Sequence, residues 1–495
     1  MAKKSYLAVD MGASSGRLLI GHFDGKRLEL EEVHRYMNGP VEMLGSYYWD
    51  LPGLWREVQN GLIKAGEKFG ATVESVGVDT WGLDYAFLDK NGKLLGNPFC
   101  YRDPRTDGIM EKSFETVSRD EIFANSGLQF MQINTLYQLI ADKQSGSVAL
   151  ENAERFMMIP DVFHWLLSGV ESNEFTESTT TQFFDPVKRD WAKGMLEKFG
   201  IPTHIFKPTS EPGSVLGEIR SSIASESGLK GMKVVLPGAH DTASAVMAVP
   251  TASQTGSTDW AYVSLGTWAL MGIESPKPIV NSTVSGFNFT NEGGVGGTTR
   301  ILKNICGMWL LQECRRVWNQ KGRNLDWEDM NRMTREAPAR TGFIDPDARD
   351  FLAPTDMPEA IRQFLKRTGQ PVPQDDGTVI RVALESIAMK FRQVLSMCDE
   401  ISGGKVKTLH IVGGGIRNKL LCRAAADATG CRVVTGPIEA TAIGNVMMQA
   451  VASGDVAGIA EARAVICDSF DVEEYLPQNT GEWDDAYERF LKVVG

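Results

Sequence analysis

Asp241 is the residue whose type and position most directly suggest chemistry. It lies in residues 236–244 (Leu-Pro-Gly-Ala-His-Asp-Thr-Ala-Ser), after an expected strand at 233–236 and before a helix of small residues that begins near Thr242. A carboxylate at such a strand–helix junction, facing a cleft, can take a proton from a hydroxyl that attacks a phosphoryl group. The alternative is that Asp241 or Thr242 is only the N-cap of the helix.

A second candidate is the turn at residues 10–16 (Asp-Met-Gly-Ala-Ser-Ser-Gly), which follows a short apolar strand at 6–9. Small residues leave backbone N–H groups accessible and two serines add hydroxyl donors, so such a turn can hold a phosphate. Asp10 can hold a magnesium ion through water, because magnesium prefers oxygen ligands and retains water molecules. The alternative is a plain hairpin in which Asp10 only forms the turn.

Two segments, 79–84 (Asp-Thr-Trp-Gly-Leu-Asp) and 101–103 (Tyr-Arg-Asp), place aromatic side chains beside carboxylates. Recognition of a polyol often uses a stacked ring with several polar groups, so these segments are candidates for a sugar site. The alternative is that Trp81 belongs to the core and that Arg102 and Asp103 form a solvated pair.

Common nucleotide-binding motifs are missing. No GxxxxGK[ST] sequence occurs, and the glycines at 413–415 are followed by Ile-Arg-Asn, so the third glycine of a dinucleotide motif is replaced by Asn418. Three glycines between a strand and a helix still allow a flat ligand such as adenine to approach closely. A tight turn without a ligand is the alternative.

Alternating strands and helices must position these candidates. We expect strands at 17–23, 28–36, 76–78, 83–88 and 408–412, and helices at 54–69, 305–320, 379–401, from 418, and 439–451. Asp24-Gly25 and Asn91-Gly92 are hairpin signals. Such an alternation with glycine turns predicts layered α/β architecture.

The expected domain boundary is residues 250–258, which contain one proline, one glycine and no large apolar residue. A strand, a turn of small residues and a second strand occur at 6–23 and again at 260–273. From the sequence alone, this recurrence agrees equally with a duplication and with chance. Residues 338–378, richer in proline and aspartate, predict a loop-rich insertion.

Composition excludes several classes of protein. The 495 residues are 42% hydrophobic and 23% charged, which excludes collagen-like, mucin-like and largely disordered chains. A net charge of −12 disfavours nucleic acid or an acidic membrane as the main partner. Seven cysteines without a CxxC pair and six scattered histidines predict free thiols and no zinc site. The apolar run at 6–9 is too short for a signal peptide and no run of about 18 apolar residues occurs, so we expect a soluble, cytoplasmic protein.

Together, the segments resemble the FGGY family of carbohydrate kinases. The resemblance extends over about residues 6 to 450 and is carried, in chain order, by residues 8–17, 78–84, 101–106, 134–139, 240–245, 264–268, 288–294, 302–305 with 309–312, and 410–415. The Asp-Thr-Trp-Gly segment at 79–82 and the Asn-Glu-Gly-Gly segment at 291–294 point, within the family, to kinases of L-rhamnulose.

The resemblance implies two α/β domains of the actin-like, ribonuclease H-like type, at 1–248 and 259–495, with an ATP- and sugar-binding cleft between them. It implies magnesium-dependent transfer of a phosphoryl group from ATP to the 1-hydroxyl of L-rhamnulose. Alternatives are a kinase of L-fuculose or another ketose and, in different classes, an actin-like ATPase module or a silent sugar sensor. The oligomeric state stays open.

The resemblance also implies a role for each matching residue. Asp241 is expected to act as the base, and Asp10 to approach the magnesium ion through water. The ketose is expected to contact Gly82, His240, Thr242 and Asn304. The nucleotide is expected to contact Ala13, Ser14, Ser15, Gly16 and Arg17 at its phosphates, Thr267 at the γ-phosphate, and Gln312 and Gly414 at the nucleoside. Cysteine pairs of certain relatives have no counterparts here, so no disulfide is expected.

Overall fold

The computed structural model describes residues 3–254 and 256–494, which form two compact units. The first unit comprises Met1–Thr255, Glu274–Ile301 and Ala440–Phe470, and the second comprises Gly256–Ile273, Leu302–Glu439 and Asp471–Gly495. The chain therefore passes between the units several times, and one of these passages, after Thr255, falls in the expected boundary at 250–258. Within that expected boundary, Thr255 lies outside the described residues.

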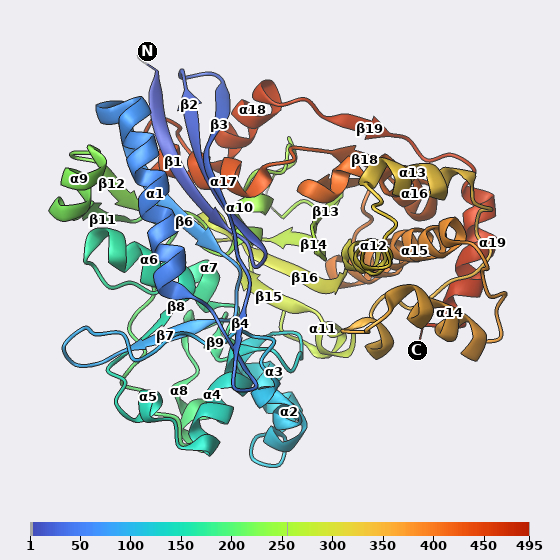
Figure 1. Ribbon diagram of the computed structural model, residues 1–495, viewed down its shortest axis with the longest axis horizontal. Coiled ribbons are helices and arrows are strands. Elements are labelled where there is room, and N and C mark those ends of the chain that lie inside the picture. Colours follow the sequence, from blue (N-terminus) through green and yellow to red (C-terminus); the bar gives the residue numbers. More distant parts are fainter. Residues whose placement is uncertain (1–2, 255, 495) are drawn as a thin grey trace. The chain divides into compact units, whose positions relative to one another are not determined.

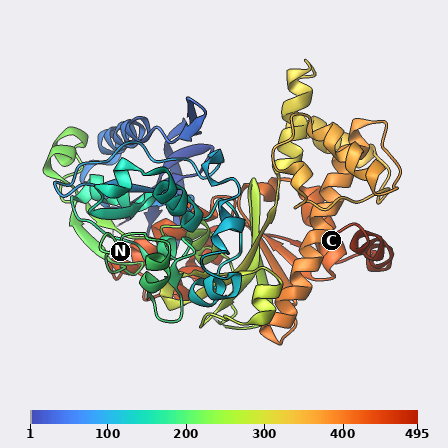
Figure 2. The ribbon, with the colours of Figure 1, turned by 90° about the horizontal axis from the view of Figure 1, so that it is seen from below.

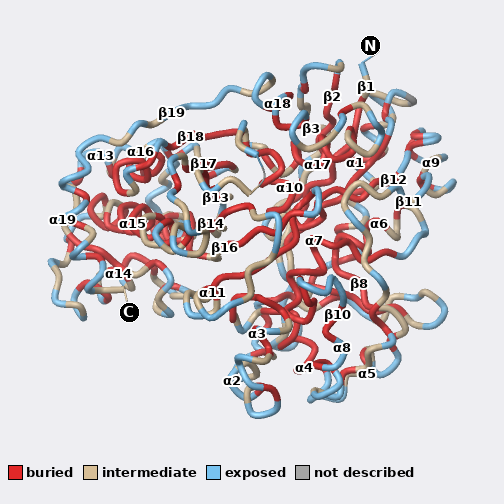
Figure 3. Tube along the Cα trace, turned by 180° about the vertical axis from the view of Figure 1, so that it is seen from behind, coloured by how far each residue is buried: buried red, intermediate tan, exposed pale blue. Residues whose placement is uncertain are grey.

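A six-stranded sheet forms the centre of the first unit (Figure 1). Its order is β11 (Val215–Glu218), β12 (Lys233–Val235), β6 (Val73–Thr80), β1 (Lys4–Met11), β2 (Ser15–Phe23) and β3 (Leu28–Met37). β1 is parallel to β6, which is parallel to β12, while β2 is antiparallel to both β1 and β3. β1 and β6 are buried along almost their whole length (Figure 3), as expected for apolar strands covered on both faces.

Helices cover both faces of this sheet. A Cβ added to Gly61 of α1 (Leu51–Phe69) would touch Leu18, whereas a Cβ added to Gly21 would touch Val446 of α17 (Ala440–Ala452). Side chains alternate between the faces of a strand, so α1 and α17 lie on opposite faces of β2. Asp50 caps the first turn of α1, where Pro52 is tolerated because no backbone N–H is needed there. Helix α6 (Ile159–Ser168) packs on β6 and β12, and α10 (Asp241–Met247) packs on α17.

The remaining elements of the first unit surround this core. Its other strands are β4 (Val41–Met43), β5 (Ser46–Tyr48), β7 (Tyr85–Leu88), β8 (Arg155–Met158), β9 (Phe184–Asp185), β10 (Asp190–Trp191) and β15 (Thr290–Gly293). Its other helices are α2 (Ile109–Ser113), α3 (Arg119–Ser126), α4 (Thr135–Ser145), α5 (Val148–Glu151), α7 (Phe175–Ser178), α8 (Lys193–Lys198), α9 (Ser221–Ser227), α11 (Ser282–Gly286) and α18 (Ile459–Ser469).

A second, seven-stranded sheet has the order β15, β16 (Thr299–Cys306), β14 (Trp268–Ser275), β13 (Trp260–Leu265), β17 (Thr408–Val412), β18 (Arg432–Thr435) and β19 (Glu473–Tyr475). Strands β13, β17, β18 and β19 belong to the second unit, and the division between the units falls within β14 and β16, so Arg300 belongs to the first unit. Helices α12 (Trp309–Gln320), α13 (Trp327–Glu336) and α14 (Met357–Arg367) pack on the long α15 (Asp376–Ser402), drawn from yellow to orange in Figure 2. Helices α16 (Lys419–Thr429) and α19 (Thr480–Leu491) pack on each other. No helix in the described part of the chain has the length and apolar character needed to cross a membrane.

The two sheets share one topology. In each, the first strand in the chain (β1 or β13) is antiparallel to the second (β2 or β14) and parallel to a later strand (β6 or β17). That later strand is parallel to the next (β12 or β18), which pairs antiparallel with an outer strand (β11 or β19). The recurrence of the opening pattern in the sequence therefore reflects a repeated topology, and chance does not explain it.

Most of the expected elements form, with ends that differ by a few residues at several positions. The helix expected at 305–320 begins only at Trp309, because residues up to Cys306 extend β16. The segment 338–378, expected to be rich in loops, contains α14 and the start of α15. The strand at 408–412 has the expected bounds.

Candidate active site

The parallel strands of the first unit bring three predicted segments to one edge of its sheet. Asp10 pairs with Arg17 on β2 and with Asp79 on β6, so all three residues are neighbours in the sheet. Thr80, the last residue of β6, forms a parallel bridge with His240, and its N–H donates to Ala239 O at 2.9 Å. Ligands of open α/β sheets bind beyond the carboxyl ends of the parallel strands, and these residues lie there.

Asp241 is the first residue of α10 and is about one-third exposed. Its Oδ1 accepts a hydrogen bond from Thr242 Oγ1 at 3.1 Å and lies 3.4 Å from His240 Nε2. Its Oδ2 has no hydrogen-bond partner among the residues that the structure describes. The N-cap of α10 is His240, so the interpretation of Asp241 or Thr242 as a mere N-cap is wrong. A partly exposed carboxylate with one unengaged oxygen can accept a proton.

Gly82 lies beside His240. A Cβ added to Gly82 would be 3.2 Å from Thr180 Cγ2 and 3.4 Å from His240 Nε2, so a side chain there would be crowded. Thr242 is buried next to Asp241. The structure thus brings together Gly82, His240, Asp241 and Thr242, which the sequence separates by about 160 residues.

The predicted phosphate turn joins β1 to β2. Gly12 N–H donates to Ser15 O at 2.9 Å, and Asn38 Nδ2 donates to Gly12 O at 2.8 Å, which fixes the turn against β3. The hydroxyls of Ser14 and Ser15 have no hydrogen-bond partner among the described residues, so they remain available as donors. Packing also requires glycine at position 16, because a Cβ there would lie 2.2 Å from Tyr36 Cζ.

The carboxylates of Asp10 and Asp79 differ in their surroundings. Asp10 Oδ2 accepts from Arg17 Nη2 at 2.7 Å. Asp79 is fully buried: its Oδ2 accepts from Asn445 Nδ2 at 2.6 Å, and its Oδ1 has no hydrogen-bond partner among the described residues. Burial, together with the nearby carboxylate of Asp10, raises the pKa of Asp79 well above its usual value.

A magnesium ion fits these residues only in a limited way. Among the described residues, no three His, Cys, Asp or Glu side chains are grouped closely enough to hold a metal ion directly. Magnesium bound with nucleotide phosphates commonly uses one or two carboxylates and retains water. Asp10 fits such a water-mediated site, whereas Asp79 beside it is fully buried.

The aromatic rings of the two segments, Trp81 and Tyr101, are buried in the core of the first unit. Trp81 is buried, as the alternative interpretation expects, and its Nε1 donates to Asp84 Oδ2 at 2.9 Å. Trp49 Nε1 donates to the same oxygen at 2.6 Å, and burial raises the pKa of Asp84 to about 6. Asp103 is also buried and accepts from the N–H of Tyr47 at 2.6 Å, so it is not part of a solvated pair.

The other predicted residues belong to the second unit. Thr267 lies in the β13–β14 turn, where its carbonyl accepts from the N–H of Trp309, the first residue of α12, at 3.1 Å. Gln312 is in the first turn of α12. Gly413, next to Gly414, has φ of 91°, and a Cβ there would lie 3.0 Å from Leu265 O. The glycine turn therefore lies against the last residue of β13, close to Thr267 in the sequence. Asn304 is on β16.

Sequence reasoning did not assign a role to Glu292 or Arg300, which contact His240. His240 Nδ1 lies 3.1 Å from Arg300 Nη2 and 3.3 Å from Glu292 Oε2. Glu292 is the acidic residue of the Asn-Glu-Gly-Gly segment, and this motif could have identified it as a functional residue. No sequence motif marks Arg300.

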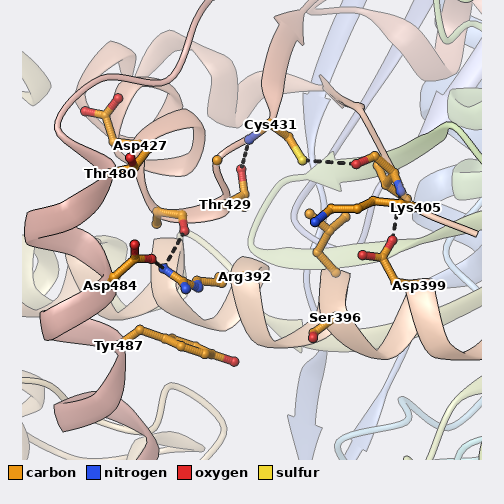
Figure 4. A pocket seen from close by; sticks show the side chains of 14 residues that line it. Arg392, Ser396, Asp399, Lys405, Asp427, Thr429, Cys431, Thr480, Asp484 and Tyr487 are labelled. Atoms are coloured by element: carbon orange, nitrogen blue, oxygen red, sulfur yellow. Dashed lines mark hydrogen bonds and ion pairs between the residues drawn. The ribbon is translucent and has the colours of Figure 1, made fainter.

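A separate pocket of about 240 Å³ lies in the second unit (Figure 4). Its charged groups are largely engaged within the protein: Arg392 pairs with Asp484 at 2.7 Å, and Asp399 accepts from the N–H of Val406 at 2.8 Å. None of the residues predicted to contact sugar or nucleotide lines it.

Family models match most of the chain. The N-terminal domain of the FGGY family of carbohydrate kinases matches residues 5–248, and the C-terminal domain of the same family matches residues 261–453. The chain belongs to this family. The predicted family and enzyme class, a carbohydrate kinase, are therefore confirmed.

Individual FGGY kinases are similar over nearly their full length. A rhamnulokinase of Bacteroides thetaiotaomicron is 39% identical, with 99% of this chain and 100% of the relative covered. Rhamnulokinases of Halalkalibacterium halodurans and Pectobacterium atrosepticum are 39% and 38% identical, over 95% and 99% of this chain and 98% and 96% of the relatives.

Solved structures of other carbohydrate kinases have the same fold. A gluconate kinase from Lactobacillus acidophilus gives a TM-score of 0.81 at 14% identity, with 99% of this chain and 98% of that chain covered. A glycerol kinase from Plasmodium falciparum, solved with ADP, gives 0.76 at 15% identity over 99% and 98% of the two chains. These likenesses and the repeated sheet topology confirm the predicted actin-like α/β fold of this FGGY kinase.

Proposed function

We propose that this protein transfers the γ-phosphoryl group of ATP to the 1-hydroxyl of L-rhamnulose, giving L-rhamnulose 1-phosphate and ADP, in L-rhamnose breakdown. Rhamnulokinases 38–39% identical over at least 95% of this chain support that substrate. The observation that carries the proposal is Asp241, whose Oδ1 is engaged by Thr242 and whose Oδ2 has no partner among the described residues, beside Gly82 and His240. The predicted location is the cytoplasm.

In the proposed reaction, Gly82, His240 and Thr242 bind the ketose, with Asn304 from the second unit. As the 1-hydroxyl oxygen attacks the γ-phosphorus, Asp241 Oδ2 takes the hydroxyl proton, and the bond to the β–γ bridging oxygen breaks to release ADP. Phosphoryl transfer depends mainly on positioning and on charge neutralisation, and it needs a single base for the proton.

The phosphates of ATP are proposed to lie against the turn of Ala13, Ser14, Ser15 and Gly16, with Arg17 as a fixed positive charge. Thr267 is proposed to approach the γ-phosphate, and Gln312 and Gly414 to contact the nucleoside. A magnesium ion bound with ATP neutralises phosphate charge, and Asp10 is proposed to hold it through water.

The test is ADP release in a coupled assay with magnesium-ATP, in which L-rhamnulose is compared with L-fuculose, L-xylulose, D-xylulose, L-ribulose and glycerol. We expect a strong preference for L-rhamnulose. A preference for another ketose would leave the proposed kinase activity in place and change the proposed substrate. Nucleotide hydrolysis without any sugar would instead favour an actin-like ATPase module.

A further inference from the structure

The Asn-Glu-Gly-Gly segment forms β15, and it places Glu292 against a buried arginine. Arg300 on β16 is fully buried, and its Nη1 lies 3.2 Å from Glu292 Oε2. Its Nε donates to Gly293 O at 2.9 Å, and its Nη2 lies in hydrogen-bond geometry 3.1 Å from His240 Nδ1. One arginine thus connects the segment that carries Glu292 to the histidine beside Asp241.

The chemistry of these groups determines which nitrogen of His240 carries the proton. A guanidinium has only donors, so a hydrogen bond from Arg300 Nη2 requires a lone pair on His240 Nδ1. Glu292 Oε2 lies 3.3 Å from the same nitrogen but makes no hydrogen bond to any described residue, whereas the contact with Arg300 Nη2 has hydrogen-bond geometry. With Nδ1 as acceptor, the ring is neutral and its proton is on Nε2, the nitrogen 3.4 Å from Asp241 Oδ1.

Glu292 makes this arrangement possible by balancing the charge of Arg300. A fully buried guanidinium without a counter-ion would be costly, and the carboxylate at 3.2 Å supplies one. Burial alone would raise the pKa of Glu292, but the adjacent Arg300 guanidinium favours the ionised carboxylate, and the pKa lies below its usual value. Glu292 is therefore ionised at neutral pH.

We propose that Arg300, with Glu292 as its counter-ion, is a positioning residue that holds His240 as the neutral tautomer protonated at Nε2. This N–H is directed at Asp241 Oδ1 and at the sugar hydroxyl next to it. Two donors, Thr242 Oγ1 and His240 Nε2, then face Oδ1, which leaves Oδ2 to take the proton. A ring protonated at Nδ1 would instead direct that N–H at Arg300 Nη2, which can only donate a hydrogen bond.

The inference rests on the proposed function, but its first test needs no activity. The full chain is labelled with ¹⁵N-histidine, and the nitrogen shifts are recorded at neutral pH. The sequence has six histidines, and the His240→Gln variant identifies the signals that disappear. We expect His240 to show a protonated Nε2 and an unprotonated Nδ1. A protonated Nδ1, alone or with Nε2, would overturn the proposal, and this measurement on the unmodified chain does not depend on whether a variant folds.

The second test is Arg300→Lys, which keeps the charge but loses the planar fork. We expect kcat to fall about 10²-fold with little change in KM for sugar, since a displaced catalytic group can cost that much, and we expect the His240 tautomer to change. Unchanged kcat and tautomer would contradict the proposal. The matched control is Glu274→Gln, which disrupts another buried pair, with Arg463 at 3.0 Å, away from His240. It should lower stability and leave the tautomer unchanged.

The two tests separate this inference from the proposed function. If no sugar is phosphorylated and His240 is protonated at Nε2, the proposed function fails and the positioning of His240 stands. If L-rhamnulose is phosphorylated and Nδ1 carries the proton, the function stands and the positioning role fails.

Discussion

At the scale of single residues, the proposed chemistry depends on how few contacts Asp241 makes. Its Oδ1 accepts from Thr242 at 3.1 Å and its Oδ2 has no partner among the described residues, so its role in the fold is small. Buried Asp79 and Asp84 on the same sheet edge have their carboxylates bound to Asn445 and to two tryptophans. The carboxylate with the fewest structural contacts is the one best suited to accept a proton.

We predict that Asp241→Asn lowers kcat by about 10²–10⁴-fold, the usual contribution of a general base, while sugar binding weakens little. Steady-state kinetics and calorimetric titration of the sugar measure the two effects. Asp50→Asn, at the exposed N-cap of α1, is the matched control and should retain full activity. Near wild-type kcat in Asp241→Asn would remove Asp241 from the mechanism.

At the scale of elements, the phosphate turn is held by the strands on either side. Gly16 pairs with Met11 on β1 and with Tyr36 on β3, and the Tyr36 ring occupies the space that a side chain at Gly16 would need. The glycine therefore serves the packing of three strands as well as the accessibility of the turn.

We predict that Gly16→Ala destabilises the first unit by about 1–3 kcal/mol, the usual cost of overpacking, and raises KM for ATP more than KM for sugar. The added Cβ would lie 2.2 Å from Tyr36 Cζ, so the ring or the turn must move. Thermal unfolding and kinetics with each substrate varied provide the measurement. Gly39→Ala is the control, since a Cβ there meets nothing within 4 Å. An unchanged KM for ATP would mean that the turn does not contact the nucleotide.

A buried acidic cluster around α7 makes stability depend on pH. Glu174 caps α7, accepting from Thr176 Oγ1 at 2.7 Å and from Glu177 N–H at 2.9 Å. Burial raises its pKa from 4.5 to about 7, and burial also raises the pKa of Glu177 and Asp161. Between pH 4.5 and 7 the folded chain retains a proton on Glu174 that the unfolded chain releases. Stability therefore falls as pH rises through this window.

We predict that Glu174→Gln removes this loss of stability with rising pH. The difference in Tm between the variant and the wild type should therefore increase from pH 4.5 to pH 7. The increase should correspond to at most roughly 3 kcal/mol. Calorimetric scans across that range test it, and Tm is used because two units need not unfold in one step. The exposed Glu115→Gln is the control and should give a difference that is independent of pH. A Tm difference for Glu174→Gln that stays constant would contradict the prediction.

At the scale of the whole molecule, the proposed residues are divided between two units. Gly82, His240, Asp241 and the turn of Ala13–Arg17 belong to the first unit, while Thr267, Asn304, Gln312 and Gly414 belong to the second. The proposed reaction needs both sets, and a site that excludes water limits hydrolysis of ATP.

We predict that L-rhamnulose together with ADP changes the small-angle X-ray scattering profile of the protein, because the two units close on the bound ligands. Each ligand alone, and ADP with a sugar that is inactive in the assay, serve as controls. Identical profiles with and without the pair of ligands would count against closure.

The sequence by itself determined the local features of this protein. Apolar runs bounded by turn residues were enough to predict β17 at its observed bounds, the β1–β2 hairpin and, to within one residue, the start of α10 at Asp241. These features follow from short-range effects, namely side-chain periodicity, capping and glycine turns, which a single stretch of chain contains. The residue types at 10–17 and 240–242 likewise indicated phosphate and base chemistry before any contact was known.

Only the tertiary structure decided which distant segments meet. Helix α17, near the end of the chain, belongs to the first unit, where it packs on β1, β6 and α10 and where Asn445 bonds to Asp79 across 366 residues. Trp81 is buried in the core against Trp49, with its N–H donated to Asp84, although its neighbours in the sequence suggested a sugar contact. Arg300 contacts His240, 60 residues earlier in the chain, and no motif marks it. Such pairings depend on the packing of whole sheets and on the burial of charge, which no local pattern contains.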